Sequence, residues 1–177
     1  IYTMPAESLV TMTWSGEQSG KPPAPIWFNN LESNSEFSSD VGSIAVQSQS
    51  TANLGGFSGV KLTTTNNGDP DINKQCVIIR PQEDSFVDAS GYEYLTFSVK
   101  DMVNPDGCTV KVTFVDNDGI VSSAWSHEST VYNNWTRIWV PIGGTEGFDR
   151  TKIAEIRLGF YWRGDYFIDD LAFSYAY

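Results

Sequence analysis

The stretch NNWTRIWVPIGGTEGFDRTKIAEIRLGFYWRGDYFIDDLAF, residues 133–173, decides the fold. Three runs within it alternate apolar and polar residues with the period of two that is typical of half-buried β-strands. In the first run, Ile138 and Val140 share one face. This spacing predicts that Arg137 and Trp139 point away from the core.

The second and third runs follow the same rule. Ile156 and Leu158 share a face, which leaves Arg157 and Tyr161 on the opposite side, so an arginine and an aromatic ring again face outward. The third run places four residues in one register, with a carboxylate among apolar side chains that we expect to be buried. A buried charge needs a partner or a metal ion. These four residues are Phe167, Asp169, Leu171 and Phe173.

Length and composition predict one compact domain with a sizeable core, since 40% of the 177 residues are hydrophobic and 14% are aromatic. A net charge of −11 with only 11 Lys and Arg argues against nucleic acid and anionic membrane surfaces. No apolar run approaches the ~20 residues that cross a bilayer, and the start lacks the features of a signal peptide. We therefore expect a mature or excised piece of a secreted, extracellular protein, as the polar composition with six Trp also indicates.

The two cysteines, Cys76 and Cys108, have no CxxC spacing and no histidine cluster beside them. Zinc and thioredoxin-like chemistry are therefore not indicated. The sequence leaves two alternatives open, a single disulfide or two inert thiols buried as small apolar side chains.

The remaining chain reads as short alternating runs separated by turns, with one possible helical turn at FDRTKIAEI. About eleven short strands in all predict an all-β antiparallel β-sandwich, a jelly roll. We expect residues 1–25 to form an N-terminal extension with an extra strand and a proline-rich loop, and residues 26–177 to form the sandwich. The Asp/Asn/Gly turn at residues 116–119 is interpreted as a hairpin rather than a calcium loop, because the bidentate Glu of an EF-hand is missing.

The order of several pieces resembles the jelly-roll carbohydrate-binding modules, the galactose-binding-like sandwiches appended to glycoside hydrolases. The resemblance covers roughly residues 28 to 174. Its carriers are NNLES, FSGVKL, YEYLTFSVKD, NNWTRIWVPI, and KIAEIRLGF leading into FIDDLAF.

This resemblance implies a non-catalytic, monomeric module that holds a polysaccharide in a cleft on its concave sheet and shares a polypeptide with a parent catalytic domain. It also implies a structural calcium ion, with Glu32 and Asp169 among the ligands and backbone carbonyls completing the shell. The alternative for Asp169 is a buried acid satisfied by arginine or backbone N–H groups.

A sugar site needs exposed flat aromatic rings flanked by hydrogen-bonding groups. The alternatives are a Trp139 that packs under the N-terminal extension, loop aromatics that cover the core, and a solvated outer face around the middle strand. The candidate ligand-binding residues are Trp139, Arg137, Tyr161, Arg157, Trp125, Trp162, Tyr94 and Lys100.

Four further residues are assigned structural roles. Trp135 is expected in the core, and Trp14 and Trp27 are expected to pack rather than to serve as platforms. His127, the only histidine, is expected to be solvent-exposed or hydrogen-bonded.

The leading functional hypothesis is recognition of plant cell-wall β-glucan, whether cellulosic, mixed-linkage or xyloglucan. A small β-sandwich glycosidase or lyase is an alternative, but Glu155, Asp165 and Asp149 are scattered and do not form an evident catalytic pair. A structural or adhesive cell-surface domain is the third hypothesis.

Overall fold

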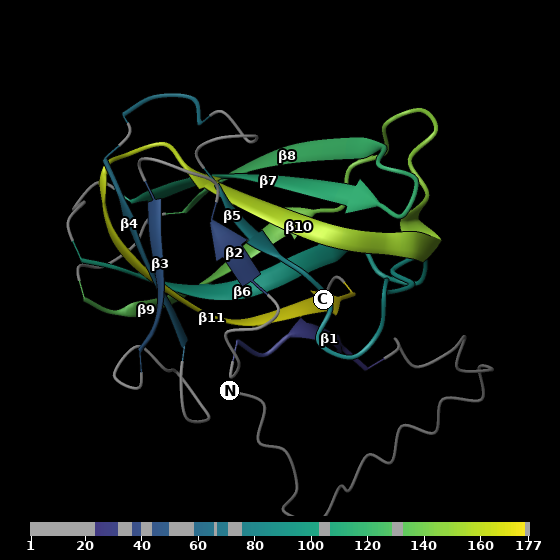
Figure 1. Ribbon diagram of the computed structural model, residues 1–177, viewed down its shortest axis with the longest axis horizontal. Helices are drawn as coiled ribbons and strands as arrows, with labels where there is room; N and C mark the ends of the chain where they lie inside the picture. The colour runs from purple at the N-terminus through teal and green to yellow at the C-terminus, as the bar shows by residue number, and fades with distance from the viewer. Residues whose placement is uncertain are drawn as a thin grey trace, which may run out of the picture.

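A computed structural model describes residues 24–31, 37–39, 44–49, 59–65, 67–70, 76–102, 107–128 and 133–175. Eleven β-strands and one short 3₁₀ helix form within these ranges (Figure 1). The elements are β1 (Ile26–Asn29), β2 (Phe37–Ser39), β3 (Ile44–Gln49), β4 (Gly59–Thr64), β5 (Val77–Ile79), β6 (Tyr94–Asp101), β7 (Cys108–Asp116), β8 (Val121–Glu128), β9 (Trp135–Pro141), η1 (Arg150–Lys152), β10 (Ile153–Phe160) and β11 (Gly164–Ser174).

The strands form two antiparallel sheets that face each other (Figure 1). The six-strand sheet has the order β3-β4-β11-β6-β9, with β1 also paired to β11, and the five-strand sheet has the order β2-β5-β10-β7-β8. From β5 onward the chain crosses repeatedly between the sheets, since β6, β9 and β11 lie in one and β7, β8 and β10 in the other. The predicted all-β jelly-roll sandwich is confirmed.

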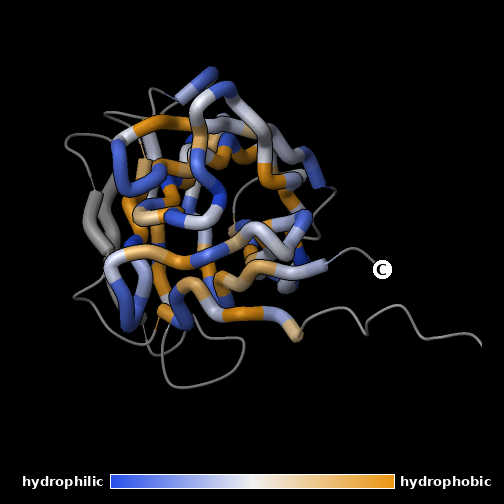
Figure 2. The backbone as a smooth tube through the Cα atoms, turned by 90° about the vertical axis from the view of Figure 1, so that its right-hand side faces the viewer, coloured by the Kyte–Doolittle hydropathy of each residue, from blue (hydrophilic) through white to orange (hydrophobic). Residues whose placement is uncertain are grey.

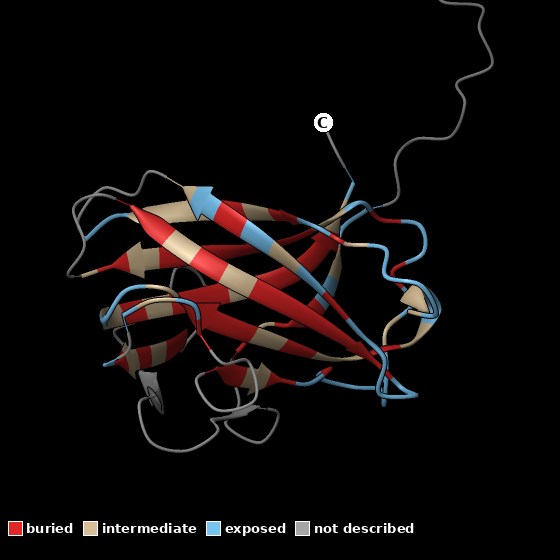
Figure 3. Cartoon of the chain, turned by 90° about the horizontal axis from the view of Figure 1, so that it is seen from above, coloured by how far each residue is buried: buried red, intermediate tan, exposed pale blue. Residues whose placement is uncertain are grey.

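The core lies between the sheets and follows the predicted alternation. Figure 2 shows apolar and polar residues alternating along the chain, and Figure 3 shows the strands as largely buried. In β8 the exposed and buried residues alternate most clearly. The inward-facing apolar residues include Leu95, Phe97, Val99, Val110, Val112, Phe114, Ile138, Val140, Ile156, Leu158 and Phe160.

The register expected for the last strand was wrong in part. Tyr166 and Ile168 lie in the core, whereas Phe167 is half-buried and faces outward. The pairing of β11 with β6 shifts between Asp169 and Ala172, and Asp170 has a φ of 58°. This bulge reverses the alternation, so Leu171 and Phe173 return to the core as expected.

The β7–β8 hairpin forms where the Asp/Asn/Gly turn predicted it. The amide of Gly119, whose φ is 83°, donates to the carbonyl of Asp116 at 3.0 Å. The Asp116 carboxylate accepts hydrogen bonds from the amides of Asp118, Ile120 and Asp149 at 2.8–3.0 Å. Its role in the structure is therefore to fix the turn.

Both cysteines are free thiols and both are buried. Burial, together with the nearby carboxylates of Asp101 and Glu128, raises the pKa of the Cys108 thiol. Of the two alternatives left open by the sequence, the structure therefore has the buried inert thiols.

The expected helical turn is present as η1, which the Asp149 side chain caps by accepting from the Thr151 amide at 2.9 Å. Residues 1–23 of the expected N-terminal extension, and Glu32, lie outside the described residues. Within the described ranges, no helix combines the length and apolar composition needed to cross a membrane.

Candidate functional site

Three aromatic side chains gather on the outer face of the five-strand sheet. Trp125 comes from β8, Tyr161 follows β10 directly, and Trp162 is its neighbour. The ring centroids of Trp125 and Tyr161 are 6.3 Å apart and those of Tyr161 and Trp162 are 4.6 Å apart, both in edge-to-face arrangements. We call Trp125, Tyr161 and Trp162 the aromatic cluster.

The aromatic cluster is accessible. Trp125 is 44% exposed and Trp162 is 41% exposed. Trp125 projects outward from β8, whose alternate residues point inward, and Trp162 lies in the bend between β10 and β11. Edge-to-face contacts leave part of each ring face uncovered by its neighbour. Flat apolar surface is therefore available to a ligand.

Tyr161 is held in place through its backbone. Its amide donates to the Thr109 carbonyl at 3.0 Å, and its carbonyl accepts from the Gly68 amide at 2.7 Å. The buried Tyr166 hydroxyl donates to the Trp162 carbonyl at 2.8 Å, and burial raises the pKa of Tyr166, which keeps this hydroxyl protonated. The aromatic cluster is therefore anchored before any ligand arrives.

Charged and polar groups surround Trp125. The Lys111 ammonium lies 5.3 Å from the centre of the Trp125 ring and forms a salt bridge of 3.1 Å with Asp69. On the next cross-strand pair, Thr109 Oγ1 lies 2.6 Å from His127 Nδ1. Hydroxyl, imidazole, ammonium and carboxylate groups thus lie beside the aromatic cluster, paired with one another.

Arg157 lies on the same outer face but is engaged with a carboxylate. Its Nε donates to Glu155 Oε1 at 2.6 Å, and the second oxygen of Glu155 accepts from Arg80 at 3.2 Å. Arg157 lies in β10, four residues before Tyr161, and its side chain is 21% exposed. The arginine therefore borders the face as part of an ion-pair network.

The other predicted candidates lie on the outer face of the six-strand sheet. The rings of Tyr94 and Trp139 are 6.0 Å apart in an edge-to-face contact. Lys100 lies over two rings, with its Nζ 5.3 Å from the centre of Trp135 and 4.9 Å from that of Phe167. Trp135 is therefore a half-buried surface contact and not the core residue that was expected.

The Arg137 side chain is hydrogen-bonded to other residues of the six-strand sheet. Its guanidinium donates to the hydroxyl of Thr96 at 2.6 Å, to the hydroxyl of Ser98 at 3.1 Å and to the carbonyl of Asp170 at 3.2 Å. Both hydroxyls are buried. Much of the hydrogen-bonding capacity of Arg137 is consequently spent within the fold.

The structure divides the predicted ligand-binding residues between two opposite faces. Arg157, Tyr161, Trp125 and Trp162 meet on the five-strand sheet, whereas Trp139, Arg137, Tyr94 and Lys100 belong to the six-strand sheet. One bound chain cannot contact both sets, because the core separates them. Only the first set presents aromatic rings that are more than 40% exposed.

The expected calcium ligand Asp169 is fully buried on the six-strand sheet. Its Oδ1 accepts from the Asp170 amide at 2.9 Å, and its cross-strand partner is Ser98, which also receives Arg137. Glu32 lies outside the described residues. Among the residues that the structure describes, no three Asp, Glu, His or Cys side chains are grouped to hold a metal ion.

The carboxylates weighed for a glycosidase reaction are separated and each has its own partner. Glu155 pairs with arginines on the five-strand sheet, Asp149 caps η1, and Asp165 binds Thr63 and Lys61 on the six-strand sheet. The Thr63 hydroxyl, with a smaller contribution from Lys61, holds the pKa of Asp165 below its ordinary value. These three acids form no catalytic pair.

Sequence reasoning missed several groups beside the aromatic cluster. Lys111, Thr109 and Asp69 were not among the predicted ligand-binding residues. Their contribution could have been found from strand pairing, since Lys111 lies opposite Trp125 and Thr109 lies opposite His127. Trp27 was expected to pack but is 58% exposed.

Comparison with known proteins finds likeness in structure alone. No protein-family model matches the sequence, and no curated protein matches it. The family 11 carbohydrate-binding module of Clostridium thermocellum, solved with a β-1,3-1,4-mixed-linked tetrasaccharide, superposes with a TM-score of 0.59 at 13% identity, covering 86% of this chain and 96% of that one. A family 30 carbohydrate-binding module gives 0.57 at 12% identity, covering 86% and 95%.

A third match is a two-module structure. The family 22 module and catalytic domain of a Clostridium thermocellum xylanase, solved with xylohexaose, give a TM-score of 0.54 at 13% identity, covering 87% of this chain and 28% of that one. At such identities the likeness concerns the fold. The chain has the jelly-roll β-sandwich architecture of carbohydrate-binding modules.

Proposed function

We propose that this chain is a non-catalytic carbohydrate-binding module and that the aromatic cluster on the five-strand sheet is its polysaccharide site. The observation that carries the proposal is the contact of two exposed rings, Trp125 and Trp162, with the half-buried ring of Tyr161 between them, flanked by polar groups. The structural neighbours support it, because modules of the same fold were solved with oligosaccharides.

The ligand class that we propose is plant cell-wall β-glucan, in cellulosic, mixed-linkage or xyloglucan form. Equatorial hydroxyls leave the faces of β-linked glucose rings apolar, and such faces stack on tryptophan and tyrosine. A ring that covers ~80 Å² contributes about 2 kcal/mol at ~25 cal/mol per Å². Micromolar affinity corresponds to about 8 kcal/mol, so several contacts must act together.

The proposed role is to hold a parent glycoside hydrolase on its extracellular substrate. The family 22 match supports this arrangement, since that module shares a polypeptide with a catalytic domain. The module itself would make no chemical change to the glycan and would act as a monomer.

The test is affinity electrophoresis against mixed-linkage glucan, xyloglucan, hydroxyethyl cellulose, xylan and mannan. We expect wild type to be retarded by the β-glucans, and Trp125→Ala to bind about 30-fold more weakly, as the loss of about 2 kcal/mol implies. Trp139→Ala, a matched tryptophan on the other face, should migrate as wild type. Unretarded migration on every glycan, or sensitivity only to Trp139→Ala, would contradict the proposal.

We also propose a structural calcium ion near Asp169. A fully buried carboxylate requires compensation, and carboxylate oxygens are ligands that calcium prefers. Calcium should raise the unfolding temperature of wild type but not of Asp169→Asn, measured by calorimetry with EDTA as the reference. If calcium leaves wild type unchanged, the neighbouring arginine and backbone groups compensate Asp169.

A further inference from the structure

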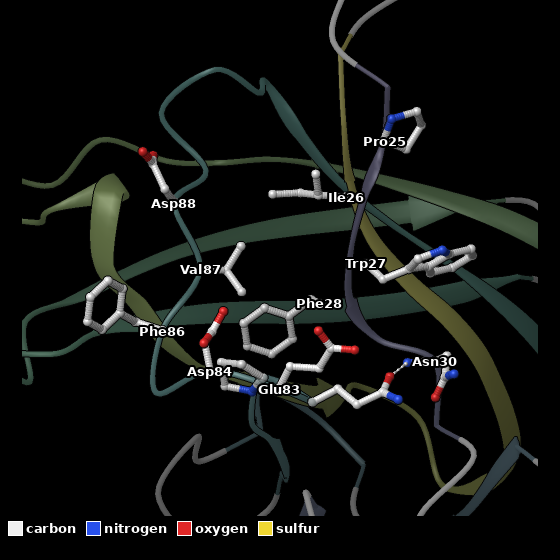
Figure 4. A pocket seen from close by; sticks show the side chains of 12 residues that line it. Pro25, Ile26, Trp27, Phe28, Asn30, Glu83, Asp84, Phe86, Val87 and Asp88 are labelled. Carbon is white, nitrogen blue, oxygen red and sulfur yellow. Dashed lines mark hydrogen bonds between the residues drawn. The ribbon is translucent and has the colours of Figure 1, made fainter.

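A groove lies between β1 and the segment 81–88 (Figure 4). Its volume is about 630 Å³, within the range of roughly 300–1,000 Å³ that is common for small-molecule sites. It shares no lining residue with the aromatic cluster or with that cluster's polar partners. Any ligand here would be bound independently of the proposed glucan site.

The walls of this groove are fixed by the fold. The Gln82 amide donates to the Phe28 carbonyl at 3.1 Å, and the Asn29 side chain donates to the Arg80 carbonyl at 2.9 Å. On the other wall, the backbones of Val87 and Ile153 exchange hydrogen bonds of 2.9 and 3.0 Å. The groove is therefore preformed, which lowers the entropic cost of binding.

Trp27 lies at the rim of the groove, on the strand that forms one of its walls. At 58% exposure it is the most exposed large apolar side chain in the described part of the chain. Its neighbour Phe28 is 1% exposed and packs edge-to-face on Phe173, so Phe28 is the residue of β1 that the core requires. Phe86, across the groove in Figure 4, is 40% exposed.

The groove is acidic as well as aromatic. Glu83, Asp84 and Asp88 line it and are exposed, whereas no lysine or arginine is among its lining residues. The Asp88 carboxylate accepts a hydrogen bond from the Ser90 amide at 2.9 Å through one of its two oxygens, and Glu83 and Asp84 add two further carboxylates to the lining. Figure 4 shows the Glu83 carboxylate on the side of the groove that faces Trp27.

We propose that this groove is a second saccharide site, in which a pyranose ring stacks on Trp27 and the carboxylates of Glu83 and Asp84 accept hydrogen bonds from its hydroxyl or ammonium groups. A platform with hydrogen-bond acceptors at its edge matches the apolar face and polar rim of a sugar. The negative charge of the groove repels the carboxylates of uronic acids. It attracts the ammonium groups of amino sugars, which we therefore expect to bind more tightly than neutral sugars. This site uses different residues from the proposed glucan site and does not depend on it.

The test follows the six tryptophan indole N–H signals in the NMR spectrum, with Trp27 assigned as the signal missing from Trp27→Ala. Titrants are oligosaccharides of glucosamine, glucose in β-1,4 linkage and galacturonic acid. We expect the Trp27 signal to shift with the first two, with tighter binding of the glucosamine oligosaccharide. Galacturonate should leave the signal unmoved.

Variants separate this site from the other. Trp125→Ala should leave the Trp27 response unchanged, and Trp27→Ala should weaken glucosamine binding about 30-fold by loss of one stacked ring. The double variant Glu83→Gln, Asp84→Asn should reduce the preference for glucosamine over glucose by about threefold to fivefold. Urea unfolding of Trp27→Ala should match wild type.

Three results would overturn the proposal. They are an unmoved Trp27 signal with all three titrants, equal binding of galacturonate, and clear destabilisation of Trp27→Ala. The last would mean that the chain itself packs against the ring. A fourth result, loss of the Trp27 response in Trp125→Ala, would also overturn it, because the groove would then be part of the glucan site and not a second one.

Discussion

The two outer faces of the sandwich carry similar residues but use them differently. Each face has an arginine, a tyrosine, a tryptophan and a lysine. On the six-strand sheet, Arg137 is bound by buried hydroxyls and Lys100 is placed over two rings. On the five-strand sheet, Trp125 stays 44% exposed. Facing outward is therefore not the same as being available, because a side chain can point out of the core and still be bound by its own sheet.

The largest expected difference between the faces is in stability. Arg137→Met would leave the buried hydroxyls of Thr96 and Ser98 without their donor, and we expect a loss of about 3 kcal/mol in the free energy of unfolding. Arg157→Met breaks a partly exposed ion pair and should cost about 1 kcal/mol or less. Urea unfolding of both variants checks this. Equal losses would remove the distinction between the faces.

The next difference is in glycan binding. Tyr161→Ala should weaken binding of a mixed-linkage oligosaccharide by about 2 kcal/mol, the contribution of one stacked ring. Tyr94→Ala, its counterpart on the six-strand sheet, should bind as wild type. Isothermal titration calorimetry at one salt concentration measures both. A loss caused by Tyr94→Ala alone would move the site to the other face.

The lysines give a smaller effect. Lys100 lies over Trp135 and Phe167, so Lys100→Gln should cost about 1 kcal/mol of stability through lost cation–π contacts. Lys111 lies over one ring and pairs with Asp69, which is 66% exposed. Lys111→Gln should cost less stability, and its main effect should be weaker glycan binding. Thermal unfolding together with calorimetric titration would show whether these two effects separate in this way.

The smallest effect concerns acid stability on the six-strand sheet. The pKa of Asp165 is below its ordinary value of 3.8 because Thr63 and then Lys61 favour the carboxylate. This stabilisation is present above about pH 4 and is lost as pH falls below that value. Asp165→Asn should therefore lose well under 1 kcal/mol at pH 7 and should match wild type near pH 2. The measurement is the urea midpoint of both proteins across a pH series. If Asp165→Asn differed from wild type by the same amount at pH 7 and at pH 2, the charge of the carboxylate would not be the cause.

The sequence predicted the sandwich and the outward-facing residues of several strands. Alternation identified Arg137, Trp139, Arg157 and Tyr161 as outward because burial imposes a period of two on a strand. It could not show that β9 and β10 belong to different sheets, since the period is the same in both. The candidate site was therefore predicted as one set and is found as two.

Two other features were beyond the reach of sequence reasoning for separate reasons. The bulge at Asp169 and Asp170 reverses the face of the preceding residues, and no apolar pattern marks it. The exposure of Trp27 depends on Phe28 filling the core in its place. Neighbouring aromatic residues in a strand point to opposite faces, but only the packing decides which one the core takes.

The pairing of β1 with β11 has a mechanical consequence. Ile26, which begins β1, lies opposite Phe173, near the end of β11. Tension applied at residues 24 and 175 would therefore load the inter-strand hydrogen bonds of this pair one after another, as in a zipper, rather than all at once in shear. This seam should open at low force, so that a tethered sandwich would yield first at β1, the strand that carries Trp27.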